Sequence, residues 1–397
     1  MVNSLYIHIP FCRKKCDYCD FFSISTFCYK KDFDLLVERY IDAVIKETEF
    51  YVRKYEIQFW NTIYIGGGTP SQIPSKLLKK LVESIVSLVP CKNDNAEITI
   101  EMNPDDVTEE LIKVVNSCGV TRISMGIQAV DDKVLRIVNR NCSVDSIYSA
   151  LKILKRMWKG RLSVDFIAGL PNHTYKSFEN QFLILDEYPI DHVSLYTLTV
   201  ESGTPLYKNI ESGKIKWSQE KADKLWIKGR NLLKKYGYNQ YEVSNFSKPG
   251  FESRHNCIYW NLENYIGVGA GASSSIYGIN AIRWTNDLSI NTYMEFWLSK
   301  TIENNCKIPA EIEYLDIKTQ EFEYLMMGFR KMEGVSSLKY KQRFGVSLED
   351  RLGVEKGLFY SWEQKKLANK TYSSGDISYS LNERGIMLLN LFLESLL

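Results

Sequence analysis

The sequence predicts an α/β fold in which a parallel sheet, either open or closed into a partial barrel, precedes a smaller, mainly helical C-terminal domain. Two patterns predict this arrangement. Short β-branched runs recur about every thirty residues with amphipathic helical patterns between them, as in parallel sheets. This repeat stops near residue 200, and from about residue 318 the pattern is mainly helical. We therefore expect three domains, at residues 1–200, 201–310 and 311–397.

Six short apolar runs, each rich in β-branched residues, are the expected strands. They are Leu5–Ile9, Thr62–Ile65, Glu97–Met102, Arg122–Gly126, Ser163–Ile167 and His192–Leu198. The first helix is expected where apolar residues from Phe33 to Ile45 follow i, i+3, i+4 spacing. The other helical patterns are Leu77–Leu88, Glu109–Asn116, Val144–Met157, Tyr175–Leu185, Gln219–Lys235 (followed by a C′ glycine at Gly237) and Glu383–Leu397.

The composition favours a globular protein with a small-molecule or protein partner. The net charge of +2 over 397 residues lacks the basic excess of a general nucleic-acid binder. Met1–Leu5 has no secretory pattern, and the two longest uncharged runs, 57–75 and 265–282, are interrupted by Gly, Ser and Asn. Nine cysteines without an export signal indicate a reducing compartment. We expect a cytoplasmic protein that meets membranes only through a partner.

Three closely spaced cysteines follow the first expected strand. Cys12, Cys16 and Cys19 form a CxxxCxxC array, and thiolates are soft ligands that suit iron–sulfur clusters or zinc. Three ligands on a [4Fe–4S] cluster leave one iron open for a small molecule. A structural zinc site, with His8 as fourth ligand, is the alternative, but such sites usually have paired CxxC halves and complete coordination.

Polar and glycine-rich segments also follow the other expected strands. A Gly-Gly-Gly-Thr-Pro segment begins at Gly66, Glu101 ends the third strand, Gln128 follows the fourth, and Gly169 follows the fifth. Because the carboxyl ends of parallel strands meet at one edge, these segments and the cysteines are expected to gather there. That gathering predicts a ligand site at this edge.

The array, together with the preceding Tyr6-Ile7-His8-Ile9-Pro10-Phe11, resembles the radical S-adenosylmethionine (SAM) superfamily, in particular the branch that contains HemN and HemW. The resemblance extends over nearly the whole chain. It implies a partial (β/α)₆ barrel, a [4Fe–4S] cluster on the three cysteines, and SAM bound to the open iron. By position it also implies a set of SAM contacts: Tyr6, Gly67, Gly68, Thr69, Glu101, Gln128, Arg140 and Asp165.

Two features place the sequence nearer to HemW-like proteins than to coproporphyrinogen dehydrogenases. The dehydrogenases carry a further cysteine two residues after the third, where this chain has Phe21. Residues 255–260 match the HNxxYW motif of HemW-like proteins. The resemblance therefore implies His255 as a heme ligand, with Tyr259 and Trp260 as pocket wall. From residue types alone, a buried histidine in an aromatic cluster is the other interpretation.

The resemblance implies a heme chaperone that binds heme, a [4Fe–4S] cluster and SAM and transfers heme to an acceptor protein. An electron donor is the other expected partner. The alternative is an oxygen-independent coproporphyrinogen III dehydrogenase, a radical SAM oxidative decarboxylase. Phe21 and the HNxxYW motif favour the chaperone, so dehydrogenase activity is not expected.

Overall fold

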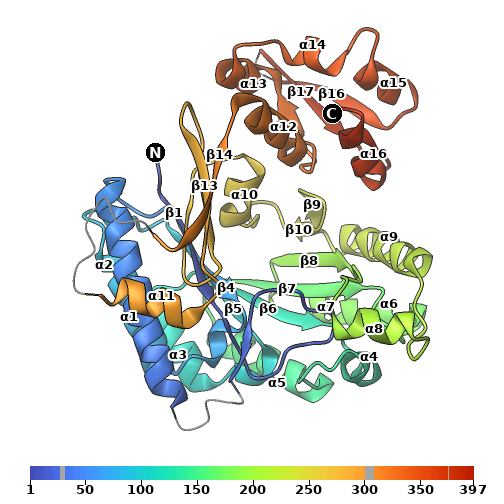
Figure 1. The fold of residues 1–397 in the computed structure, drawn as a ribbon. Coiled ribbons are helices and arrows are strands. Elements are labelled where there is room, and N and C mark those ends of the chain that lie inside the picture. Colours follow the sequence, from blue (N-terminus) through green and yellow to red (C-terminus); the bar gives the residue numbers. More distant parts are fainter. Residues whose placement is uncertain (27–31, 300–307, 374) are drawn as a thin grey trace.

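One nine-stranded sheet organises the first two thirds of the chain (Figure 1). The computed structural model describes residues 1–26, 32–299, 308–373 and 375–397. The strand order is β11-β1-β4-β5-β6-β7-β8-β10-β9. The six central strands run parallel and are β1 (Ser4–Ile9), β4 (Thr62–Gly67), β5 (Glu97–Met102), β6 (Arg122–Gln128), β7 (Arg161–Ala168) and β8 (His192–Thr197). They confirm the six expected strands and the α/β fold.

Three short strands at the edges of this sheet were not expected. β11 (Ile266–Val268) adds to β1 in parallel. On the other side, β10 (Asn245–Ser247) pairs antiparallel with β8, and β9 (Asn239–Gln240) pairs antiparallel with β10. The sheet ends at β11 on one side and β9 on the other, so the barrel is partial. Strands of two or three residues carry no readable alternation, and long-range pairing alone defines them.

Amphipathic helices connect the parallel strands. The longer ones are α1 (Phe33–Lys54), α2 (Ser75–Ser87), α3 (Glu109–Ser117), α5 (Val144–Met157) and α9 (Gln219–Lys235), close to their expected bounds. Gly237 has φ +82, as expected for a C′ glycine. The pattern from Tyr175 is divided into α6 (Tyr175–Asn180), a 3₁₀ turn and α7 (Ile184–Glu187), and α4 (Asp132–Ile137) and α8 (Pro205–Glu211) are additional.

Each central strand turns one face to apolar neighbours and the other to the barrel interior. In β1, Leu5, Ile7 and Ile9 are completely buried in the hydrophobic core, and the alternate residues Tyr6 and His8 are polar. The same alternation in β4 to β8 gives the interior face residues that include Thr62, Tyr64, Glu97, Thr99, Glu101, Arg122, Ser124, Ser163, Asp165, His192 and Ser194. The barrel interior is therefore polar along its length.

A second hydrophobic core belongs to the C-terminal part of the chain. Leu325, Phe329, Tyr340, Leu381 and Phe392 are buried in it. Around it lie α12 (Ile317–Gly328), α13 (Ser337–Phe344), α14 (Leu348–Leu352), α15 (Leu358–Gln364) and α16 (Leu389–Glu394). The mainly helical character is as expected, but the final helix is shorter than the pattern from Glu383 predicted. A small antiparallel sheet of β15 (Val335–Ser336), β17 (Asp376–Leu381) and β16 (Ala368–Ser373) also occurs.

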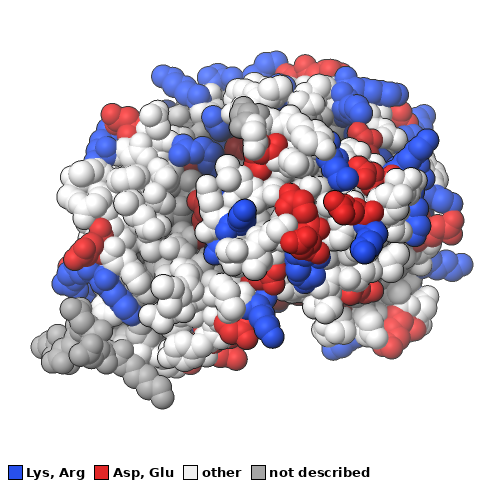
Figure 2. Space-filling view, turned by 90° about the horizontal axis from the view of Figure 1, so that it is seen from above, with Lys and Arg blue, Asp and Glu red and all other residues white. Residues whose placement is uncertain are grey.

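Residues 254–315 add α10 (Arg254–Trp260), α11 (Ile290–Trp297) and an antiparallel sheet of β12 (Ser273–Ile276), β13 (Ala281–Asn286) and β14 (Ala310–Leu315). The buried side of α11 belongs to the first core, where this helix packs against α1. Among the described residues, no helix has the length and apolar character needed to cross a membrane. The face in Figure 2 carries basic and acidic side chains interspersed.

Candidate cofactor site

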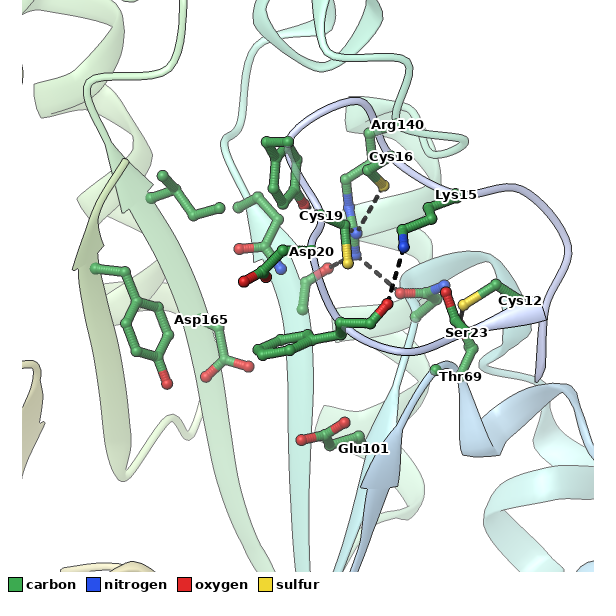
Figure 3. A pocket seen from close by; sticks show the side chains of 18 of the residues that line it. Cys12, Lys15, Cys16, Cys19, Asp20, Ser23, Thr69, Glu101, Arg140 and Asp165 are labelled. Carbon is green, nitrogen blue, oxygen red and sulfur yellow. Dashed lines mark hydrogen bonds between the residues drawn. The ribbon is translucent and has the colours of Figure 1, made fainter. Parts of the chain in front are cut away.

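A pocket of about 440 Å³ lies at the carboxyl ends of the parallel strands. Its roof is the loop of residues 12–23, here the cysteine loop, which carries Cys12, Cys16 and Cys19 (Figure 3). Glu101 and Asp165 project from β5 and β7 beneath it. The pocket lining includes the three cysteines and seven of the eight expected SAM contacts: Gly67, Gly68, Thr69, Glu101, Gln128, Arg140 and Asp165. Residues from six separate segments thus meet where the strand pattern predicted.

Contacts from several elements fix the cysteine loop. His8 Nε2 lies 3.0 Å from the carbonyl oxygen of Phe22, and the Asp17 N–H donates to the Val138 carbonyl at 3.0 Å. Because the Phe22 carbonyl oxygen can only accept a hydrogen bond, His8 Nε2 carries the ring proton. Burial lowers the His8 pKa, so its neutral Nδ1 accepts from the Tyr6 hydroxyl at 3.0 Å. Tyr6 therefore lies behind the pocket wall and supports His8, outside the pocket lining.

The cysteine sulfurs are partly exposed to the pocket and unbridged. Cys12 Sγ lies 3.5 Å from Thr69 Oγ1, and burial raises the pKa of the Cys12 and Cys19 thiols. Among the described residues, no three His, Cys, Asp or Glu side chains converge as a single metal ion requires. A cubane cluster places no such requirement, because each thiolate binds a different iron. With both His8 nitrogens already hydrogen-bonded, the zinc alternative finds no support here.

The glycine segment after β4 has little room for side chains. A Cβ on Gly67, whose φ is +110, would lie 2.5 Å from the His8 ring, and one on Gly68 would lie 2.7 Å from the Phe11 carbonyl oxygen. The N–H groups of Gly67, Gly68 and Thr69 donate to Glu101, Ile9 and Phe11. This backbone can therefore meet a ligand only through its carbonyl groups, which suit an ammonium group.

Two carboxyl groups lie beneath the cysteine loop. Glu101 accepts hydrogen bonds from the Tyr64 hydroxyl at 2.8 Å and the Gly67 N–H at 3.1 Å, yet burial raises its pKa to about 7. Burial also raises the pKa of Asp165, whose carboxylate accepts from Ser124 Oγ at 3.4 Å. Each carboxylate has lone pairs left for an amino or hydroxyl donor.

Gln128 and Arg140 also line the pocket. Gln128 has φ +69 where the β6–β7 register shifts, which is an unusual conformation for a residue with a side chain. Arg140 donates to Asn103 Oδ1 at 2.8 Å, to Cys16 Sγ at 3.6 Å and to the Gly126 carbonyl. The Arg140 guanidinium thus places positive charge against the cysteine loop.

Sequence reasoning missed several lining residues. Asn103 bonds both Arg140 and Thr69, and Ser124 contacts Asp165. Tyr18 and Tyr196 also line the pocket. Strand alternation could have indicated two of them. Asn103 follows Glu101 by two residues, and Ser124 lies on the same strand face as Gly126, so both point to the same side as expected site residues. Cys28, which is near the cysteine array in sequence, lies outside the described residues.

His255 lies at the opposite end of the barrel. Its ring is fully buried, with Nδ1 2.8 Å from Thr62 Oγ1 and Nε2 2.8 Å from the Tyr259 hydroxyl. Thr62 begins β4, and the carboxylate of Glu97, which begins β5, accepts from the N–H groups of Arg254 and His255. Burial lowers the His255 pKa to about 3, so the ring is neutral. Tyr259 also packs edge-on against Tyr265, and α10 thereby closes the amino end of the barrel.

Comparison with known proteins identifies the family. The radical SAM superfamily model matches residues 6–185. The heme chaperone HemW of Lactococcus lactis is 34% identical over 354 residues, which are 89% of this chain and 88% of that protein. HemW of Bacillus subtilis is 30% identical, over 91% of this chain and 94% of its own length. The chain belongs to the HemW family of the radical SAM superfamily. Coproporphyrinogen III oxidase (HemN) from Escherichia coli has the same fold, with a TM-score of 0.79 at 20% identity over 100% of this chain and 90% of HemN.

The radical SAM family implies a [4Fe–4S] cluster and SAM, and the pocket of this HemW family member suits both. The pocket is lined by three thiols, the glycine segment after β4, two carboxyl groups and a guanidinium. The fit to heme at His255 is poor. One nitrogen of a neutral imidazole is protonated and the other accepts a hydrogen bond here, so neither has a free lone pair for iron. The His255 heme ligand stays a prediction, and it requires that one of these two hydrogen bonds be released.

Proposed function

We propose that this HemW family member is a cytoplasmic heme chaperone that binds a [4Fe–4S] cluster, SAM and heme and passes heme to an acceptor protein. The observation that carries the proposal is the convergence of Cys12, Cys16 and Cys19 with seven expected SAM contacts in one pocket. The names of the Lactococcus and Bacillus relatives support the chaperone function. An electron donor that reduces the cluster belongs to the same proposal.

Each group in the pocket has a role in this proposal. The three thiolates hold three irons and leave the fourth for the amino and carboxylate groups of SAM. The cluster supplies an electron when reduced. Carbonyl groups of Gly67 and Gly68 receive the SAM amino group, while Glu101 and Asp165 accept hydrogen bonds from its amino or hydroxyl donors. Arg140 supports the loop by donating to Cys16 Sγ.

The second candidate function is oxygen-independent coproporphyrinogen III dehydrogenase, and the fold shared with HemN supports it. Phe21 is the observation against it. This side chain lines the pocket and is 66% exposed, at the position where a dehydrogenase carries its further cysteine. A phenyl ring cannot supply the thiol at that point, so the chaperone is the preferred function.

The proposed division of labour follows the chain. Residues 1–200 form the cofactor-binding barrel, residues 201–310 extend and close it, and residues 311–397 form the C-terminal domain. The heme ligand is not assigned to His255 in the conformation described, because both of its ring nitrogens are hydrogen-bonded.

Anaerobic reconstitution of the full chain, followed by heme titration, heme transfer and coproporphyrinogen turnover, tests the function. We expect a cluster absorbance that depends on Cys16, stoichiometric heme binding, and transfer of that heme to an apo-hemoprotein. Porphyrin formation in proportion to protein concentration would replace the chaperone with the dehydrogenase. A chain that binds neither iron–sulfur cluster nor heme would refute both.

A further inference from the structure

A second cavity, of about 400 Å³, lies where α10 meets the C-terminal part of the chain. We call it the junction pocket. Trp260 and Asn261 line it from the end of α10, and α12, the segment 331–336, α13 and β17 supply most of the rest. Neither the cysteine loop nor any expected SAM contact reaches it. The position of α10 beside α12 can be followed in Figure 1.

The acidic residues of the junction pocket are already engaged. Asp376 accepts from Ser336 Oγ and from the Leu338 N–H at 2.9 Å. Glu333 pairs with Lys331 Nζ at 2.7 Å, and Glu263 accepts from Asn261 Nδ2 at 3.0 Å. Only Glu333 is paired with a cation, whereas Asp376 and Glu263 accept from neutral donors and keep their negative charge.

Two of the three cations in the pocket form no ion pair among the described residues, although the charges of Glu263 and Asp376 act on them. Lys331 Nζ is held by Glu333 and by Asn261 Oδ1 at 2.7 Å. Arg343, in contrast, donates one hydrogen bond, to the Leu262 carbonyl at 3.0 Å, and neither Arg343 nor Lys339 has an ion-pair partner among the described residues. An arginine in this position has guanidinium donors available for a carboxylate or phosphate.

Aromatic side chains fix the Arg343 guanidinium at the pocket. It lies 5.2 Å from the ring centroid of Tyr324 and 5.5 Å from that of Tyr277. Burial lowers its pKa, so an anion there would replace solvation that the guanidinium has lost. Trp260, the last residue of the HNxxYW motif, adds an indole ring to the same wall.

We propose that the junction pocket is an anion site that binds the carboxylate edge of a planar ligand, with Arg343 and Lys339 as the carboxylate-binding pair and Trp260 against the ring face. Given the proposed function, on which this inference rests, the ligand is heme and the bound groups are its propionates. A volume of about 400 Å³ is near the lower end for ligand pockets, roughly 300–1,000 Å³. One edge of the macrocycle is thus enclosed and the other stays accessible to an acceptor.

Two lysines on α13 allow a test within a single sample. Lys339 lines the pocket, whereas Lys341, two residues along the same helix, is exposed and does not. We expect heme to protect Lys339 from acylation, measured by mass spectrometry, with no protection of Lys341. Heme dimethyl ester, which lacks free carboxylates, should protect neither lysine. Equal reactivity of Lys339 with and without bound heme would overturn the proposal.

Variants supply the second test. Lys339→Glu combined with Arg343→Gln should weaken heme binding about tenfold or more, and Lys341→Glu should leave it unchanged. The double variant should bind the dimethyl ester as the wild type does, which separates lost carboxylate contacts from lost folding. If the wild type binds heme and the double variant binds it equally well, the junction pocket is not the site. If the wild type binds no heme, the proposed function falls, and protection of Lys339 by inorganic phosphate then decides whether the anion site stands.

Discussion

The two ends of the barrel interior are both polar, yet they differ in how completely their polar groups are partnered. At the carboxyl end, Glu101 and Asp165 face a cavity and retain lone pairs for a ligand. At the amino end, Glu97 caps α10 and His255 has a partner on each nitrogen. Glu97 and Glu101, one at each end, are four residues apart on β5, or roughly 13 Å.

That difference explains why the cysteine array lies at a cavity and the His255 ring does not. Polar residues in a barrel indicate a site only when their hydrogen-bonding capacity is left unused. His192 at the amino end repeats the pattern of His255, since Ser163 and Tyr241 occupy its two nitrogens at 2.7 and 2.8 Å. The amino end is therefore expected to control stability and the carboxyl end to control binding.

The largest expected effect is at the carboxyl end, in Cys16→Ala. Loss of one of three thiolate ligands should abolish the cluster absorbance after reconstitution, with iron and sulfide falling at least tenfold. Cys91→Ala is the matched control, because Cys91 is exposed and distant in sequence from the loop. Full iron and sulfide content in Cys16→Ala would remove Cys16 from the ligand set.

At the amino end, Glu97→Ala should act on stability. The buried carboxylate accepts from two N–H groups of α10, so its loss should lower the free energy of unfolding by about 2 to 4 kcal/mol in urea titrations. Glu97→Gln, which keeps one acceptor oxygen, should recover part of this. Asp94→Ala, at an exposed position, should change little.

SAM affinity is the second measurement on these variants. Once the Glu97 variants are folded and reconstituted, we expect their SAM affinity to stay within about twofold of wild type, because α10 lies at the other end of the barrel. A large loss of SAM affinity without loss of stability would show that the two ends are coupled, and the comparison would fail.

The pH dependence of SAM binding tests Glu101. Its pKa of about 7 means that the carboxyl group is ionised at pH 8 and protonated at pH 6. A protonated Glu101 is a poorer acceptor for the amino or hydroxyl donors of SAM, so affinity should fall about tenfold as pH drops from 8 to 6. Asp165 faces the same cavity, and its raised pKa should add to the slope at lower pH.

Glu101→Gln separates the two carboxyl groups. In this variant the affinity should be lower at pH 8 and nearly constant down to pH 6, as measured by equilibrium binding of SAM to the reconstituted protein. An unchanged pH profile in Glu101→Gln would mean that another group controls the titration.

The sequence predicted the six central strands well, because each pairs an apolar outer face with enough β-branched residues to be seen locally. It could not reveal β11, whose Ile266–Val268 forms a strand only by pairing with β1. Nor could it locate α10. The acceptors of the Arg254 and His255 N–H groups come from Glu97, more than 150 residues earlier, and no local pattern encodes that pairing.

Most of the pocket at the carboxyl end could be predicted from the sequence. Seven of the eight SAM contacts expected from the carboxyl-end rule and the family resemblance line one pocket. Tyr6 differed because its hydroxyl bonds His8 instead of facing the cavity. The junction pocket could not be predicted, because its lining comes from separate elements that include α10, α12, α13 and β17. No sequence motif indicates how these elements pack together.

The smallest expected effect, in Tyr259→Phe, distinguishes the two interpretations of His255 by sign. If His255 is a structural residue, removal of the hydroxyl leaves a buried nitrogen unpaired and lowers stability by about 1 to 2 kcal/mol, with heme affinity unchanged. If α10 opens in solution and His255 ligates iron, the same change removes a competitor for Nε2, and heme should bind more tightly with a shifted Soret band. Because burial in an apolar, hydrogen-bonded environment already holds the ring neutral, protonation cannot produce the second result. A gain in heme affinity would therefore place the heme iron at His255, at the amino end of the barrel.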